Sequence, residues 1–128
     1  HIHGNMLSRW TDFLTSDGEK TWRTRDAEFE AVIKTKEDLL KIWEEGWKCT
    51  MDTLDALTAA DLMKTVYIRA EPHTVIDAIN RQLAHYPYHV GQMIYAAKML
   101  KNGGWQSLSI PKNKSAEFNV EKFAGKKG

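Results

Sequence analysis

The sequence is poor in several features that would each indicate a particular class of protein. Cysteine occurs once among 128 residues, at Cys49, so the chain cannot form an internal disulfide and suits a reducing compartment. No apolar run approaches the roughly 20 residues that span a bilayer. Residues 1–20 also lack the pattern of a secretory leader. We therefore expect a cytoplasmic protein that does not insert into a membrane.

An excess of charge of one sign is also missing. The chain carries 18 basic and 17 acidic side chains, a net charge of +1, without the clustering that a nucleic-acid surface needs. What is present is an apolar fraction of 42% with five tryptophans, which is typical of a folded chain. We expect no nucleic-acid partner.

Apolar residues at helical spacing predict three sizeable helices. The first covers residues 1–16 or so, and the last, about 73–102, has a broad apolar sector and ends at two glycines. The middle helix begins at Thr35, and Asp38 three residues later makes a variant of the capping box. Long helices of this kind predict an all-α fold.

The connections between these helices are shorter or more polar. Residues 58–62 predict a capped turn, and 64–74 alternate enough to allow a brief extended or hairpin segment. Arg23 and Arg25 are expected to be solvated, as surface arginines usually are. After residue 104 we expect an extended tail along the surface.

The first helix begins without a capping residue, although free N–H groups at a helix start normally need partners. Because short bundles close most easily with four helices, we expect a four-helix bundle that lacks its first helix in this chain. Without that helix, the apolar stripe of the middle helix, which contains Trp43 and Trp47, would be exposed. A second copy could cover that stripe, so a homodimer is expected.

The segment "HYPYHVGQMIY", residues 85–95, carries the strongest chemical pattern. His85 and His89 are four residues apart, so on a helix they lie one turn apart and can offer two ring nitrogens to one metal ion. Gln92 extends the same row. Pro87 lies between the histidines, at a position that costs a helix about 3 kcal/mol. The pattern indicates a metal site, or else a helix bent around a bulky partner.

A third metal ligand has to come from elsewhere in the chain. Zinc sites that keep a place for water commonly use three protein ligands. The N-terminal "HIHGN" offers His1 and His3, which point to different faces of a helix. A helical wheel favours His3, because it lies closer to the apolar side, but the spacing alone does not decide.

The stretches "HIHGNMLSRWTDFLTSDGEKTWRTRDAEFE" and "RQLAHYPYHVGQMIYAAKML" resemble the DinB superfamily, in its DUF1572-like branch of small uncharacterised bacterial proteins. The resemblance covers residues 1–118 or so, which sets the expected domain, with 119–128 as a flexible basic tail. It implies a DinB-like four-helix bundle and a divalent metal on three histidines, in H-x-x-G-N and H-x-x-x-H patterns. The implied ligands are His1, His85 and His89. The family's first helix has no counterpart here.

The resemblance also implies a metal-dependent enzyme that acts on a small-molecule substrate. Members of the superfamily transfer low-molecular-weight thiols such as bacillithiol or mycothiol, one is a thiol-dependent isomerase, and others are described as hydrolases. A metal on three neutral imidazoles with an open position can activate water, bind a thiolate or polarise a carbonyl. The expected cofactors are a divalent metal, zinc or nickel, and a low-molecular-weight thiol.

No catalytic residue can be assigned, because no carboxylate accompanies the row from 85 to 92. Asn5 and Gln92 are candidates for contacts to a ligand residue or to the substrate. Tyr88 and Tyr95 are expected to pack or to form an interface. The alternative is a non-catalytic, metal-binding helical dimerisation module, in which the same histidines would serve stability.

Overall fold

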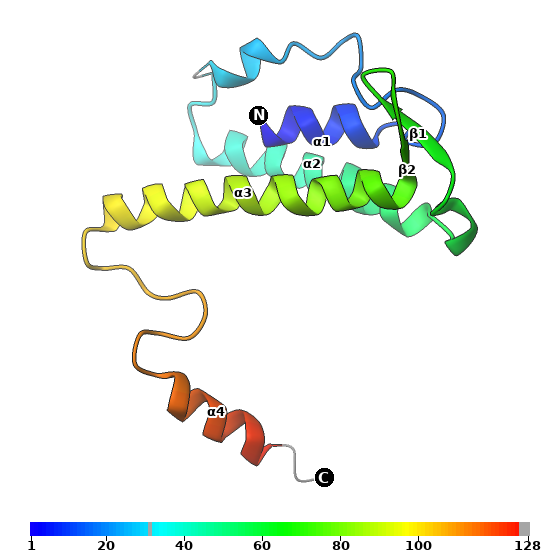
Figure 1. The fold of residues 1–128 in the computed structure, drawn as a ribbon. Helices are drawn as coiled ribbons and strands as arrows, with labels where there is room; N and C mark the ends of the chain where they lie inside the picture. Colours follow the sequence, from blue (N-terminus) through cyan, green and yellow to red (C-terminus); the bar gives the residue numbers. More distant parts are fainter. Residues whose placement is uncertain (31, 126–128) are drawn as a thin grey trace. The chain divides into compact units, whose positions relative to one another are not determined.

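The computed structural model describes residues 1–30 and 32–125, which form two compact units, residues 1–89 and the residues from Val90 onward. Among the described residues, strands β1 (Thr65–Ile68) and β2 (Glu71–Thr74) pair as an antiparallel hairpin. The remaining elements are α1 (Ile2–Trp10), η1 (Asp26–Phe29), α2 (Lys36–Ala56), η2 (Ala59–Asp61), α3 (Val75–Lys101) and α4 (Ser115–Ala124) (Figure 1). The chain is therefore mostly helical, as expected, with one small sheet.

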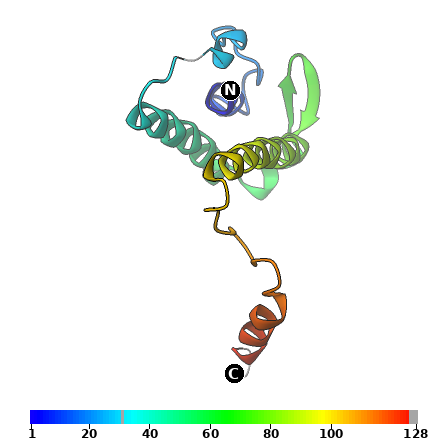
Figure 2. The same cartoon turned by 90° about the vertical axis from the view of Figure 1, so that its left-hand side faces the viewer.

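The core of the first unit forms around α1. Met6 and Trp10 are 1% and 2% exposed, and Figure 2 shows α1 end-on, flanked by α2, α3 and the hairpin. Trp10 donates its indole N–H to the hydroxyl of Tyr86 in α3 at 2.9 Å. Gly46 lets α2 come close, since a Cβ there would lie 2.8 Å from the sulfur of Met6. α1 and the residue before it are thus fixed between two helices.

The hairpin turn is built from two residues with left-handed backbone. Arg69 and Ala70 have φ angles of 56° and 62°, which side chains other than glycine, asparagine and aspartate rarely adopt. The Asp17 carboxylate accepts both of their backbone N–H groups, at 2.8 and 2.7 Å. This contact anchors the turn to the segment that follows α1 and so holds Arg69 next to that segment.

Two predicted starts are confirmed by their hydrogen bonds. Thr35 precedes α2 and accepts the backbone N–H of Asp38 at 3.1 Å. Thr58 and Asp61 form a reciprocal capping box around η2. The predicted hairpin and the long last helix are also present, at residues 65–74 and 75–101. These features depend on neighbouring residues, which is why the sequence alone indicates them.

The prediction that the first helix reaches residue 16 is wrong. α1 ends at Trp10, Thr11 is extended, and Asp12 has a φ of 49°. The carbonyl of Asp12 accepts the N–H groups of Thr15 and Ser16, both at 3.0 Å, so the chain turns instead of continuing. The turn still buries Phe13, whose apolar character had suggested more helix.

The expectation of an extended segment after residue 104 is also wrong for part of its length. Residues 115–124 form α4. Helix-favouring Ala116 and Glu117 stand in its first turn, and the Lys114 ammonium bonds the Glu117 carboxylate at 2.8 Å. Residues 126–128 of the expected flexible tail lie outside the described residues.

The apolar stripe of α2 is only partly covered. Trp47 and Leu54, with Leu57 just after the helix, pack against the core, whereas Leu39 and Trp43 are 50% and 38% exposed. Within the described residues, no helix combines the length and the apolar character that a membrane crossing requires.

Candidate metal centre

Three histidines from opposite ends of the first unit converge at one point. His1 precedes α1, while His85 and His89 lie one turn apart on α3. One ring nitrogen from each lies within 4.8 Å of the other two. The Nε2 atoms of His85 and His89 are 3.0 Å apart, and the His1 ring meets those of His85 and His89 edge-on at centroid distances of 5.5 and 5.2 Å.

The orientation of His1 is fixed by a carboxylate from η1. His1 Nδ1 bonds Glu28 Oε2 at 2.8 Å, which leaves Nε2 as the ring nitrogen free for another partner. Arg23 holds that carboxylate with two bonds, Nε to Oε1 at 2.7 Å and Nη2 to Oε2 at 2.9 Å. Such carboxylate contacts fix the tautomer and the ring plane of metal-binding histidines.

Gly4 supplies the space for this arrangement. A Cβ at Gly4 would lie 2.6 Å from Cδ of Glu28, so any larger residue would displace the carboxylate from His1. This gives a physical reason for glycine in "HIHGN". The His1 ring is also stacked on Phe29, at a centroid distance of 5.0 Å.

His85 is held from its other side by polar residues of the core. Its Nδ1 lies 3.3 Å from Oε1 of Gln82, and the Gln82 amide nitrogen donates to Oδ1 of Asn5 at 3.2 Å. Gln82 and Asn5 are 4% and 6% exposed. A buried chain of amides therefore links α3 to α1 beneath the rings.

Burial, and then the neighbouring His89, lower the pKa of His85 from its ordinary value. The His85 ring is therefore neutral at neutral pH, and a neutral imidazole is the form that binds a metal. The lower pKa thus favours the protonation state that ligation needs.

The three rings could hold a divalent metal ion. Two nitrogens bound at about 2.1 Å lie about 3.0 Å apart at a right angle and about 3.4 Å apart at the tetrahedral angle. The His85 and His89 nitrogens already have this spacing, at 3.0 Å. Three imidazoles with a carboxylate behind one of them are donors suited to zinc, nickel, iron or copper.

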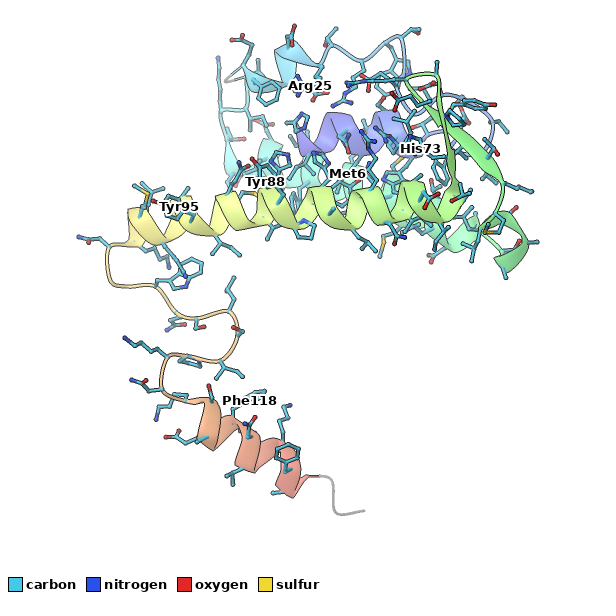
Figure 3. The ribbon with its side chains drawn as sticks, in the orientation of Figure 1. Met6, Arg25, His73, Tyr88, Tyr95 and Phe118 are labelled. Carbon is cyan, nitrogen blue, oxygen red and sulfur yellow. The ribbon has the colours of Figure 1, made fainter. Side chains whose placement is uncertain are left out.

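A pocket of about 230 Å³ opens beside the rings, lined in part by His1, His85, Asn5 and Gln82. A small molecule in this pocket would contact two of the three histidines directly. Figure 3 shows Arg25, another lining residue, on the segment that runs over α1.

The remaining candidate residues lie elsewhere or have other partners. His3, which the helical wheel favoured, bonds Glu45 of α2 at 2.9 Å and is not among the three converging histidines. Gln92 is exposed on α3, in the second unit. A Cβ at Gly91 would meet nothing within 4 Å, so no packing contact requires glycine there.

The family pattern described as a protein of unknown function, DUF1572, matches residues 1–114. The chain belongs to the DUF1572 family. No curated protein and no solved structure matches it. The match covers α1, α2, α3 and all three converging histidines, so the site lies within the part of the chain that defines a DUF1572 protein.

Three residues of this DUF1572 site were not found from the sequence. Glu28 and Arg23 lie in the irregular charged connection, and nothing in its pattern indicates that Glu28 bonds His1. The expectation that Arg23 is solvated is wrong, because its side chain is only 3% exposed and bonds the Glu28 carboxylate. Gln82 stands three residues before His85 on the same helix. Glu28 is remote in sequence from residues 85–92, so no local pattern links it to the site, whereas Gln82 stands at the i, i+3 spacing from His85 that places two residues on one helix face.

Proposed function

We propose that this protein is an enzyme that binds a divalent metal, zinc or nickel, through His1, His85 and His89 and uses the metal in catalysis. The observation that carries the proposal is the convergence of the three rings beside a polar pocket, with one ring oriented by Glu28. When bound, the metal would supply a Lewis acid that activates a thiol cofactor or water. The proposed reaction is thiol transfer or hydrolysis.

The other residues of the site have positioning roles in this proposal. Glu28 and Gln82 hold the rings of His1 and His85, and Asn5 fixes Gln82. Gln92 keeps its proposed role as a further contact near the ligands or the substrate. The buried amides also keep bulk water from the back of the rings, while the pocket admits substrate from the front.

We also propose a DinB-like bundle and a cytoplasmic location. In this proposal α1, α2 and α3 are three of the four helices of the bundle. The exposed apolar side of α2, with Leu39 and Trp43, would pack against a fourth helix, from this chain or from a second copy. The absence of a second cysteine supports a reducing compartment.

The first experiment measures the metal directly. Elemental analysis of the full chain, purified without a histidine tag, should find about one divalent metal per chain. His1→Ala, His85→Ala and His89→Ala should each lose it, whereas His3→Ala should retain it, because His3 bonds Glu45 instead. Metal content that is equal in all four variants would exclude this site.

The second experiment tests catalysis. The metal-loaded protein is incubated with electrophiles, with and without a panel of small thiols, and with ester and amide substrates. Turnover that requires a thiol supports transfer, and turnover without one supports hydrolysis. His85→Ala should abolish either reaction.

A metal-binding dimerisation module without catalysis is the second candidate. The observation that favours it is the exposure of large apolar side chains, Leu83 and Tyr88 on α3 at 66% and 64% and Leu39 on α2 at 50%. Bound metal without turnover, in a protein that sedimentation shows to be a homodimer, would favour this candidate.

A further inference from the structure

All five arginines of the chain line the pocket beside the histidines. They are Arg9, Arg23, Arg25, Arg69 and Arg81, and we call the cavity that they share with the rings of His1 and His85 the arginine pocket. None of the described lysines lines it. Lysine and arginine carry the same charge, but the planar guanidinium presents a fork of donors that matches the oxygens of a carboxylate or a phosphate. The choice of arginine alone therefore points to such a ligand.

Arg9 is the most informative member, because two nitrogens of its buried guanidinium make no hydrogen bond with the protein. The residue is 5% exposed, and its Nε and Nη1 atoms make no hydrogen bond. Burial, and then the charge of Arg81, lower the pKa of Arg9 to about 10, so the guanidinium remains charged at neutral pH. Buried donors of a charged group that lack hydrogen bonds destabilise a fold, so these two nitrogens point to a ligand rather than to a role in folding.

The fold keeps Arg9 in this position. Ser8 accepts the backbone N–H of Lys20 at 2.9 Å and donates to the carbonyl of Gly18 at 3.0 Å, which fastens that loop to α1. A Cβ at Gly18 would lie 2.8 Å from Cδ and Nε of Arg9, so glycine lets the side chain pass towards the pocket.

The nearby acidic groups are already engaged. Glu19 lines the pocket, but it bonds Arg23 at 3.1 Å and pairs with Arg69 at 3.4 Å. Glu28 is held by Arg23 and His1. Among the described residues that line the pocket, five guanidinium groups thus face one carboxylate, and the excess positive charge is left for a ligand.

We propose that the arginine pocket binds the anionic group, a carboxylate or a phosphate, of the small molecule whose reacting end lies at the three histidines. Arg9 and Arg81 bind that group, and the rings of His1 and His85 line the neighbouring side of the pocket. The position of the reacting end rests on the function proposed above. The anionic group itself requires only the arginines, so the two ideas can be tested apart.

The test is calorimetric titration of the full chain, as purified and after removal of metal with a chelator. Inorganic phosphate and succinate are the two anionic probes, and succinamide is the neutral control at the same ionic strength. We expect one or both anions to bind in both preparations and succinamide not to bind. The stronger anion identifies the group as a phosphate or a carboxylate.

Arg9→Met tests the pocket, with Lys48→Met as the matched control on the exposed surface of α2. Arg9→Met should weaken anion binding by about ten-fold or more, since it removes a charged fork. It should also raise the melting temperature of the anion-free protein, because it removes buried charged donors that the protein leaves without hydrogen bonds. A purely structural arginine would give the opposite shift. Lys48→Met should change neither value.

Arg81→Gln provides a second variant at an exposed position, where folding is not at risk. It should weaken anion binding and leave the melting temperature unchanged or higher. Anion binding that survives both substitutions, or no binding of either anion to the unaltered chain, overturns the proposal. Bound metal without anion binding would overturn this inference alone. Anion binding to a chain that takes up no metal would overturn the proposed function and leave the anion pocket standing.

Discussion

Replacing Gly4 by alanine should damage the metal site without touching a histidine. The added Cβ would lie 2.6 Å from Cδ of Glu28, well inside normal contact distance. The carboxylate has little room to yield, because Arg23 holds both of its oxygens and its side chain is only 12% exposed. We therefore expect Gly4→Ala to push Glu28 away from Nδ1 of His1.

The size of the effect follows from the bond that is lost. Removing the partner of a metal-binding histidine typically lowers metal affinity about 10- to 100-fold, or about 1.4–2.7 kcal/mol. Competition with a chromophoric chelator measures this affinity in the full, untagged chain. Glu28→Gln should lose a similar amount, because an amide does not supply the charge that holds the His1 ring.

Gly91→Ala is the matched control, since it introduces the same methyl group two residues after His89. A Cβ at Gly91 meets nothing within 4 Å, and alanine favours a helix over glycine by about 1 kcal/mol. This variant should keep its metal affinity and melt at the same or a higher temperature. If Gly4→Ala binds metal as tightly as Gly91→Ala does, then Glu28 does not orient the ring and our account of His1 is wrong.

Three further predictions concern the frame of the site. Ala70→Gly should stabilise the chain by about 1 kcal/mol in urea denaturation, because glycine adopts a φ of 62° without strain; an unchanged midpoint would contradict this. Tyr86→Phe should cost about 1–3 kcal/mol, because it leaves the buried Trp10 N–H unpaired, whereas Tyr88→Phe, at an exposed position, should cost little in the same assay. Burial raises the pKa of Asp17, but the N–H groups of Ala70, Glu19 and Arg69 outweigh it and lower that pKa below its ordinary value. The ionised carboxylate therefore stabilises the fold above about pH 4, and this contribution is lost as the pH falls through the lowered pKa. Asp17→Asn should be less stable at pH 7, and its deficit should shrink below about pH 4; a deficit that does not change with pH would refute the assignment.

The helices were predictable where their signals are local. Thr35 and Thr58 cap their helices through residues three positions away, and the paired glycines after Lys101 stand where α3 ends. The end of α1 was missed because the chain turns at Asp12, which no proline or glycine announces. A left-handed aspartate is stabilised by bonds that form only once the loop has folded.

The two histidines of α3 were predictable for the same reason, since i, i+4 spacing guarantees one face. The choice between His1 and His3 was not local. Both start near the same helix end, but α1 packs between α2 and α3, so His3 meets Glu45 of α2 while His1 meets α3. A helical wheel describes one helix and carries no information on which neighbour each face meets. The resemblance to DinB proteins favoured His1, the residue that the fold brings to the pair.

The arginine pocket shows a further limit of composition. A net charge of +1 argues against a nucleic-acid surface, yet it also conceals how the two kinds of cation are distributed. The arginines come from residues 9–81 and meet at one cavity, while the described lysines lie elsewhere. Over the whole chain, the acidic residues nearly balance the positive charge. Within the pocket, the one lining carboxylate does not balance the five arginines. Because electrostatic energy depends on the distance between charges, a neutral chain can still carry a strongly positive site. The composition therefore constrains the surface as a whole, and the chemistry of the ligand has to be sought in the pocket where the arginines meet.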